Sequence, residues 1–280
     1  MTSLWRVYLR LGRVSNLPTV WTNCLAGVIL AGASPEPVSF ALLLASMCLL
    51  YVSGMFLNDA FDQEFDRKYR PERPIPSGEI PGRHVYAIGF GLMLAGLAIL
   101  LASTIEAILW GSALSALIVY YNYRHKRDPA SPSIMALCRV MVYFCAAAAT
   151  GGTALTPKVI GGAAVLMAYM IGLTYVAKQE NLTEVKNLWP LVFLAAPFLY
   201  AYAVAPGILY PLFLAWVLYA LSHLFKAKKN IPRAVVSLIA GISLLDGVLI
   251  AEAAPLESWS WLGIAGFLLT LFFQRYVSGT

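Results

Sequence analysis

Residues 58–67 read Asn-Asp-Ala-Phe-Asp-Gln-Glu-Phe-Asp-Arg and follow directly on an almost wholly apolar stretch, residues 38–57. A run of about 20 apolar residues is long enough to cross a bilayer as a helix. If the helix continues, Asn58, Asp62 and Asp66 lie at i, i+4 and i+8 on one face. Carboxylates placed in this way repel one another and oppose the negative end of the helix dipole. A cation is therefore expected among them, and Mg²⁺ suits such hard oxygen ligands.

The whole chain has the composition of a membrane protein. It has 280 residues, of which 60% are hydrophobic and 12% are charged, whereas a soluble domain carries about 25% charged residues. Its apolar segments lie near residues 17–33, 38–57, 84–103, 105–122, 133–153, 158–177, 188–205, 208–225, 233–253 and 258–275. Only Pro206 and Gly207 separate one pair of segments. We therefore predict an all-α, polytopic transmembrane bundle of nine to ten spans.

The net charge of +6 follows a topological pattern and does not indicate a nucleic-acid partner. With the N-terminus in the cytoplasm, most Lys and Arg residues fall in inner loops, and Lys158 is the one clear positive charge outside. This is the positive-inside pattern. We expect a multi-pass protein of the cell (inner) membrane, with both ends and the polar loops in the cytoplasm.

We expect one transmembrane domain over residues 1–280. Residues 1–16 are basic and aromatic and are predicted to form an interfacial segment. The longer inner loops, 58–83 and 178–187, are predicted to carry the active site.

A second pair of acids follows a later apolar segment on the same predicted side of the membrane. Glu180 and Glu184 lie at i and i+4 if that helix continues. The two acidic clusters could be two halves of one site. The alternative is an exposed helix end whose charge is balanced by Lys178 and Lys186.

The stretch after the first cluster, residues 67–78, contains three prolines and several cations. The prolines make it rigid. Arginine forks match phosphate oxygens, and Mg²⁺ usually binds through a few carboxylates together with substrate phosphates. This combination at a membrane interface predicts a ligand with a diphosphate head and an apolar tail.

These motifs resemble those of the UbiA superfamily of intramembrane prenyltransferases. The resemblance rests on Asn58-x-x-x-Asp62-x-x-x-Asp66 and on Arg-Pro-x-Arg-Pro-Ile-Pro-Ser-Gly at 70–78. Residues 13–19 resemble the family's entry to its first helix, and residues 121–127 resemble its Tyr/Lys loop. The resemblance extends over most of the chain.

The resemblance implies a helical bundle with a central cavity open to lipid and short cytoplasmic cap helices. It implies transfer of a prenyl group from a prenyl diphosphate to an aromatic or lipid acceptor, a small hydrophobic molecule, with Mg²⁺ as cofactor. The implied Mg²⁺ and catalytic residues are Asn58, Asp59, Asp62, Asp66, Glu180 and Glu184, and those on the diphosphate are Arg13, Arg73 and Lys126.

The second motif departs from the family pattern, because Glu180-x-x-x-Glu184 stands where the family has two aspartates. Ten spans in place of nine are a second departure. Such divergence resembles the UbiA-like EboC subgroup. It leaves an alternative function open, in which a non-catalytic protein binds or exports an isoprenoid or aromatic metabolite.

Polar residues inside the apolar segments are further candidates. Asp246 lies near the middle of one segment, where a carboxylate is costly and therefore a functional candidate. It could equally hold helices together by hydrogen bonds. Asn23 and Arg139 likewise either line the cavity or pack helices. The scattered histidines have no metal-ligand partner at i+4, so no metal role is expected for them.

Overall fold

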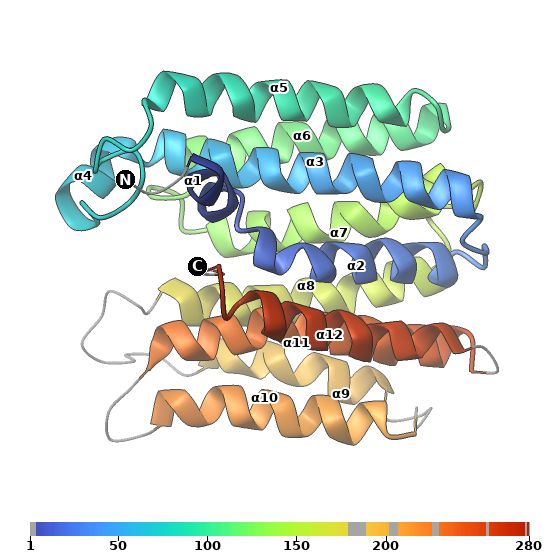
Figure 1. Cartoon of the computed structure of the whole chain (residues 1–280). Helices are drawn as coiled ribbons and strands as arrows, with labels where there is room; N and C mark the ends of the chain where they lie inside the picture. Colours follow the sequence, from blue (N-terminus) through green and yellow to red (C-terminus); the bar gives the residue numbers. More distant parts are fainter. Residues whose placement is uncertain are drawn as a thin grey trace.

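The structure is a computed structural model, and it describes residues 4–178, 189–201, 207–225, 230–255, 258–277 and 279. Every regular element within these ranges is a helix (Figure 1). The elements are α1 Leu4–Leu11, η1 Val14–Asn16, α2 Leu17–Leu30, α3 Pro37–Phe61, α4 Gln63–Tyr69, α5 Gly82–Leu100, α6 Ile105–Arg124, α7 Ser131–Ala149, α8 Pro157–Lys178, η3 Trp189–Ala195, α9 Ala196–Ala201, α10 Leu209–Phe225, α11 Ile231–Ala253, η4 Ser258–Ser260 and α12 Trp261–Phe273.

The prediction of an all-α, polytopic membrane bundle is confirmed. In the described part of the chain, 6 helices are long and apolar enough to cross a membrane, namely α3, α5, α6, α7, α8 and α11. Shorter apolar helical stretches cover Val14–Leu30, Leu191–Tyr200, Leu209–Phe225 and Ser258–Phe273. Within the described residues, each predicted segment thus overlaps a helix or helical stretch, whereas the number of spans, nine or ten, stays a prediction.

Local chemistry sets where several of these helices begin. A proline stands in the first turn of α2, α3, α7 and α11, where its missing N–H costs no helical hydrogen bond. The side chains of Glu36, Thr104 and Asn230 cap α3, α6 and α11 by accepting hydrogen bonds from backbone N–H groups.

The long helices lie side by side, and α11 sits among α2, α8, α10 and α12 (Figure 1). Helices α2 and α7 approach each other closely at Gly27. A Cβ atom on Gly27 would lie only 2.7 Å from the carbonyl oxygen of Tyr143 and 2.8 Å from Cβ of Ala146. Small residues at such a contact let two helix backbones meet. This contact brings the polar residues of α2 next to those of α7.

Two short helices, α1 and α4, lie at the same end of the bundle (Figure 1). The apolar face of α1 buries Val7 and Leu11 in a small core with Phe56, Ile80 and Val85. An ion pair between Arg10 and Glu79 joins α1 to the loop that precedes α5. Helix α1 therefore packs on the end of α3 and on residues 70–81.

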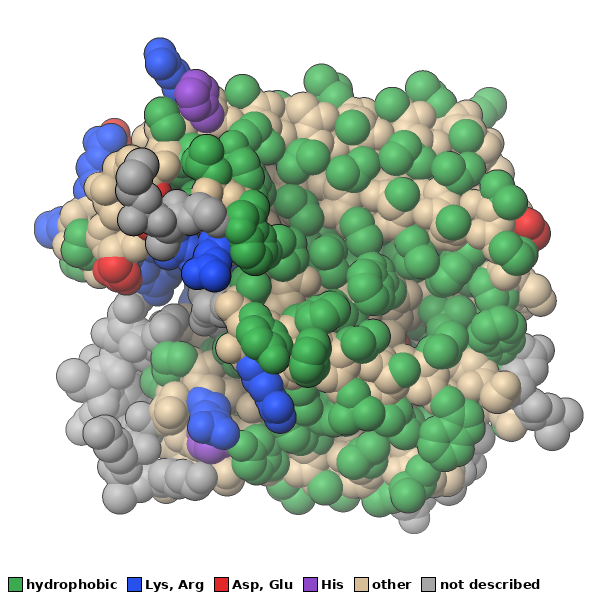
Figure 2. All heavy atoms as spheres, in the orientation of Figure 1, with side chains coloured by type: hydrophobic (Ala, Val, Ile, Leu, Met, Phe, Trp, Pro, Cys, Tyr) green, Lys and Arg blue, Asp and Glu red, His purple; other side chains and the backbone are tan. Residues whose placement is uncertain are grey.

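Charged side chains gather at this end. On the face shown in Figure 2, Lys and Arg side chains cluster where α1 and α4 lie, and hydrophobic side chains cover most of the remaining surface. Such an apolar surface is what lipid chains would cover. The chain is therefore an integral, multi-pass membrane protein.

Candidate active site

The acidic cluster spans the junction between α3 and α4. Helix α3 ends at Phe61, and Asp62 is both its C-cap and the N-cap of α4. The backbone N–H of Asp62 still donates to the carbonyl of Asn58 at 3.0 Å, and that of Asp66 donates to Asp62 at 2.8 Å. The helical spacing of Asn58, Asp62 and Asp66 is thus kept across the junction.

All three aspartates are buried, with exposures of 7% for Asp59, 5% for Asp62 and 1% for Asp66. Burying a carboxylate is costly unless a positive group or hydrogen-bond donors surround it. The surrounding positive groups come from three other parts of the chain.

The first of these groups is Arg73 of the proline-rich loop. Its Nη1 atom lies 3.0 Å from Oδ2 of Asp66 and 3.2 Å from Oδ1 of Asp59. One guanidinium therefore bridges two carboxylates of the cluster.

The second group is Arg13, which precedes η1. Its Nη2 atom donates to Oδ1 of Asp59 at 3.2 Å and to Oδ1 of Asn58 at 3.3 Å. Its backbone is left-handed, with φ 43° and ψ 46°, a conformation that non-glycine residues seldom adopt and that often occurs at functional sites. The Arg13 guanidinium thus contacts the end of α3.

The third group is the end of α6. Nζ of Lys126 lies 3.0 Å from Oδ2 of Asp62, and Nε2 of His125 lies 3.4 Å from the same oxygen. Lys126 also lies 4.2 Å from the ring centroid of Phe65, and the His125 ring stacks on Tyr121. His125 is not among the predicted site residues, because a lone histidine without a partner at i+4 carries no metal-ligand signal in the sequence.

The pKa values of two aspartates shift in opposite directions. Burial acts to raise the pKa of Asp62, but the hydrogen bond from His125 and the charges of His125 and Lys126 outweigh burial and hold this pKa below its usual value. Burial raises the pKa of Asp66 above its usual value, and Arg73 offsets only part of this effect. The surroundings thus stabilise the charged form of Asp62, whereas the positive charge of Arg73 does not fully offset the cost of burying the charged form of Asp66.

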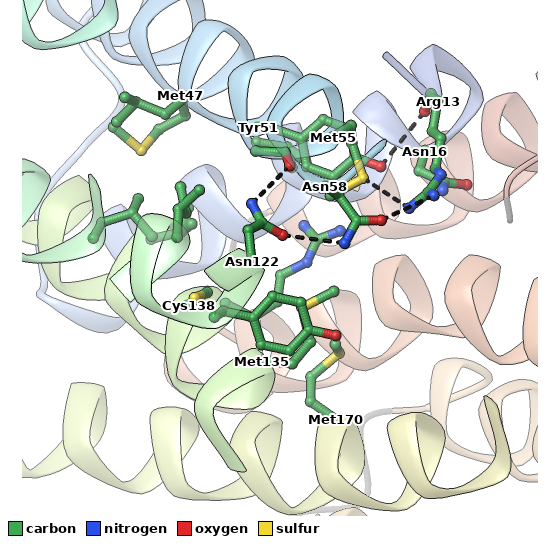
Figure 3. A pocket seen from close by; sticks show the side chains of 18 of the residues that line it. Arg13, Asn16, Met47, Tyr51, Met55, Asn58, Asn122, Met135, Cys138 and Met170 are labelled. Atoms are coloured by element: carbon green, nitrogen blue, oxygen red, sulfur yellow. Dashed lines mark hydrogen bonds between the residues drawn. The ribbon is translucent and has the colours of Figure 1, made fainter. Parts of the chain in front are cut away.

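A cavity of about 170 Å³ lies within the bundle and meets this cluster at Asn58 and Arg13. Its polar end contains Arg13, Asn16, Asn58 and Asn122 (Figure 3). Its apolar lining includes Val20, Met47, Leu50, Leu114, Ile118, Met135, Val142, Met170 and Ile239. A polar mouth with an apolar interior suits an amphiphilic ligand. The central cavity is present as predicted, and its opening to lipid stays a prediction.

Hydrogen bonds of two asparagines hold the side chains at the polar end of the cavity in place. Asn58 donates to Oδ1 of Asn122 at 3.1 Å, and Asn122 donates to the carbonyl of Gly54 at 3.1 Å (Figure 3). These bonds connect α3 to α6 and fix the side-chain oxygen of Asn58 toward Arg13. Asn122 is not among the predicted site residues, because an asparagine at a helix end has no distinguishing signal in the sequence.

The intramembrane polar residues form a network behind the cavity. Asp246 on α11 is fully buried and accepts hydrogen bonds from Asn23, Thr22 and Tyr143. Asn23 in turn accepts from Arg139 at 2.8 Å. Asp246 and Asn23 do not line the described cavity and instead link α2, α7 and α11, whereas Arg139 lines it.

The residues present fit a divalent cation by their chemistry. Oδ1 of Asp66 is buried and has no hydrogen-bond partner among the described residues, so an acceptor oxygen is available for a cation. The described residues contain no group of three His, Cys, Asp or Glu side chains already gathered for a metal. Their carboxylates instead contact arginine and lysine. Glu180 and Glu184, the predicted second half of the site, lie outside the described residues.

The sequence profile described as the UbiA prenyltransferase family matches residues 19–181, which is more than half of the chain. The chain belongs to the UbiA prenyltransferase family. This agrees with the resemblance carried by its first acidic motif and its proline-rich loop.

The chain is similar to curated relatives over part of its length. It is 32% identical over 149 residues to the digeranylgeranylglyceryl phosphate synthase of Methanopyrus kandleri, covering 52% of this chain and 54% of the relative. It is 31% identical over 122 residues to the enzyme of the same name from Methanoculleus marisnigri, covering 44% of this chain and 43% of the relative. The chain thus spans about half the length of the curated relatives it matches.

Solved structures share the fold over nearly the whole chain. A structure of digeranylgeranylglyceryl phosphate synthase superimposes with a TM-score of 0.62 at 22% identity, covering 91% of this chain and 100% of that one. A UbiA homologue from Archaeoglobus fulgidus bound to GPP and Mg²⁺ gives a TM-score of 0.54 at 17% identity, covering 95% and 99%. Identities this low establish the fold alone.

Proposed function

We propose that this protein transfers a prenyl group from a prenyl diphosphate to an acceptor within the membrane, with Mg²⁺ as cofactor. The observation that carries the proposal is the meeting of buried aspartates with arginine and lysine side chains next to Asn58 and Arg13, which line the polar end of an apolar cavity. The structural relative from Archaeoglobus fulgidus, which binds GPP and Mg²⁺, supports the same assignment.

The residues divide into two roles. The oxygen atoms of Asn58, Asp59, Asp62 and Asp66 would hold Mg²⁺, which when bound supplies positive charge to the diphosphate oxygens. The arginines at this end, Arg13 and Arg73, present forked donors that match phosphate oxygens, and Lys126 adds a point charge. Glu180 and Glu184 are proposed to complete the site.

The reaction breaks the bond between C1 of the prenyl chain and the diphosphate oxygen, and the diphosphate leaves with the electron pair. A new bond forms between C1 and the nucleophilic atom of the acceptor, whose proton passes to water or to the diphosphate. Arg13, Arg73 and Lys126 stabilise the negative charge that develops on the leaving group. The apolar lining excludes water from the carbocation-like carbon.

The acceptor is proposed to be a small hydrophobic molecule, either a lipid or an aromatic compound. The curated relatives are named for a glyceryl phosphate product, which favours a lipid. We also propose that the acidic cluster faces the cytoplasm, because the cations of the predicted inner loops lie at this end.

The test uses purified full-length protein with labelled geranyl, farnesyl and geranylgeranyl diphosphates, with and without Mg²⁺. Release of diphosphate only in the presence of Mg²⁺, and its loss in Asp62→Asn, would support the proposal. A donor that binds in the presence of Mg²⁺ but is never converted with lipid and aromatic acceptors would overturn it. That outcome would favour the alternative of an isoprenoid-binding or exporting protein.

A further inference from the structure

His125 follows the last residue of α6 and reaches the acidic cluster from there. It is the C-cap of α6, and its backbone N–H donates to the carbonyl of Tyr121 at 2.8 Å. Its side chain is 11% exposed, and Nε2 lies 3.4 Å from Oδ2 of Asp62. This side chain is neither one of the proposed Mg²⁺ ligands nor one of the proposed diphosphate-binding cations, yet it contacts Asp62.

The His125 ring is held in place from two other sides. Nδ1 lies 3.2 Å from the carbonyl oxygen of Asn122, near the end of α6, where a histidine side chain can donate to a carbonyl of the last turn. The carbonyl oxygen only accepts, so Nδ1 is the donor. The ring also stacks on Tyr121, with 4.9 Å between the centroids and 20° between the ring planes. With the ring held in this way, Nε2 faces Asp62.

Lys126 contacts the same oxygen of Asp62 but is held less firmly than His125. Its Nζ atom lies 3.0 Å from Oδ2, and its side chain is 38% exposed. Lysine carries its charge on a flexible four-carbon stem, whereas the histidine ring is fixed by a stack and a hydrogen bond. Lys126 is also one of the cations proposed to contact the diphosphate. It can therefore turn from Asp62 to a bound diphosphate, whereas His125 stays against the carboxylate.

Among the described residues, the ion pairs of each aspartate in the cluster fall on a single oxygen atom. Asp59 is contacted at Oδ1, and Asp62 and Asp66 are contacted at Oδ2. Oδ1 of Asp66 is buried and has no hydrogen-bond partner within the described part of the chain. A carboxylate that is held at one oxygen can offer the other to a cation. The side chains that hold metal ligands in this way orient them for the metal.

We infer that His125 is a positioning residue for Asp62: it holds Oδ2 of this carboxylate when Lys126 contacts the diphosphate, and it thereby keeps the other oxygen of Asp62 available to Mg²⁺. This inference rests on the proposed function, in which Asp62 is a Mg²⁺ ligand. Replacing a residue that holds a metal ligand typically weakens metal binding by about 10- to 100-fold. His125 should therefore affect metal binding through its Nε2 atom and not through its bulk.

Three variants of the full-length protein separate the contacts of the ring. His125→Phe keeps a ring that can stack on Tyr121 and removes both nitrogen atoms. His125→Gln places an amide nitrogen near the position of Nε2, where it can still donate to Asp62. His125→Asn places one near the position of Nδ1, which suits the carbonyl of Asn122. The matched control is His84→Gln, because His84 is an exposed histidine near the start of α5.

Metal binding is measured by electron paramagnetic resonance with Mn²⁺, which takes the same oxygen ligands as Mg²⁺. The donor analogue geranylgeranyl S-thiolodiphosphate is present, so that a diphosphate is bound but does not leave. His125→Phe and His125→Asn are expected to raise the Kd of Mn²⁺ by about 10- to 100-fold. His125→Gln should raise it much less, and His84→Gln should leave it unchanged.

Turnover of geranylgeranyl diphosphate gives a second measurement. In His125→Phe, the Mg²⁺ concentration for half-maximal diphosphate release should rise by about 10- to 100-fold, whereas kcat at saturating Mg²⁺ should fall less. A general loss of structure would instead lower kcat at every Mg²⁺ concentration. If His125→Phe does not fold, the comparison of His125→Gln with His125→Asn still decides whether the Nε2 position matters.

Equal Mn²⁺ affinity of wild type and His125→Phe would overturn the inference. Tighter binding by His125→Phe than by His125→Gln would also overturn it, because stacking on Tyr121 would then explain the role of the ring. Absence of Mn²⁺ binding by the wild-type protein would overturn the proposed metal site and this inference with it. Binding of Mn²⁺ and analogue without any diphosphate release from the true donor would overturn the proposed transfer, while the Mn²⁺ comparison would still decide the role of His125.

Discussion

Arg73 lies 3.0 Å from Asp66 and so ties the proline-rich loop to the acidic helix that follows α3. The same nitrogen atom contacts Asp59 at 3.2 Å. A loop segment and two carboxylates are thus held together by one guanidinium. This arrangement explains how buried acids can exist at the end of an apolar helix before any ligand binds.

Replacing this arginine should destabilise the protein. Arg73→Gln leaves Asp59 and Asp66 with fewer positive partners, and the expected loss is about 1–3 kcal/mol of unfolding free energy. Thermal unfolding in detergent measures the effect, and added Mg²⁺ should recover part of it. Arg67→Gln, an exposed arginine of α4, is the control. The interpretation fails if both variants unfold at the same temperature as the wild type.

Asp66→Asn should separate metal binding from folding. Asparagine has nearly the shape of aspartate and keeps an oxygen that can accept the hydrogen bond from Arg73, so the fold should be retained, whereas a cation would lose a negatively charged ligand. We expect the Mg²⁺ concentration for half-maximal diphosphate release to rise at least about 10-fold, the typical lower effect of altering a metal site. Glu64→Gln, an exposed acid of α4, should behave as wild type. Unchanged Mg²⁺ dependence of Asp66→Asn would count against the metal assignment.

Asp62 should contribute to stability in a pH-dependent way. Its pKa in the folded state lies below its usual value because of His125 and Lys126, against the effect of burial. The contribution is therefore fully present above the unfolded pKa of about 3.9 and is lost as the pH falls through the lower folded value. Thermal unfolding of wild type and Asp62→Asn between about pH 3 and 6 measures this. The difference between them should shrink toward the acid end, and a constant difference would contradict the assignment.

Gly27→Ala should disturb the contact between α2 and α7. Its Cβ atom would lie 2.7 Å from the carbonyl oxygen of Tyr143, so one backbone must move, at an expected cost of about 1–3 kcal/mol. Gly91→Ala is the matched control, since a Cβ atom there meets nothing within 4 Å. Because alanine favours helix, this control should be neutral or stabilising by up to about 1 kcal/mol. Equal stability of the two variants would show that the helices do not require the close approach.

Much of the fold could be predicted from the sequence. Long apolar runs such as residues 38–57 can satisfy their backbone polar groups in a bilayer only as helices or closed barrels, and their length suits helices. The helix ends were harder to place. Predicted span 17–33 ends at Leu30 as α2, for example, because Ala31 and Gly32 already form a turn.

The candidate site was predicted in part. The i, i+4 and i+8 spacing of Asn58, Asp62 and Asp66 depends only on helix geometry, so a run of ten residues was enough to place these side chains together. For Asn23 and Asp246 the sequence is compatible with both cavity lining and helix packing. In the structure both form hydrogen bonds between helices, and neither is among the residues that line the cavity.

The helical class, the membrane setting and the acidic motif follow from the amino-acid sequence, because each depends on composition or on spacing within one helix. Which cation contacts which carboxylate depends instead on the tertiary structure. Arg13 reaches Asp59 across 46 residues, and Lys126 reaches Asp62 from the end of another helix. Such contacts depend on how separate helices pack, for which a single sequence holds no local signal.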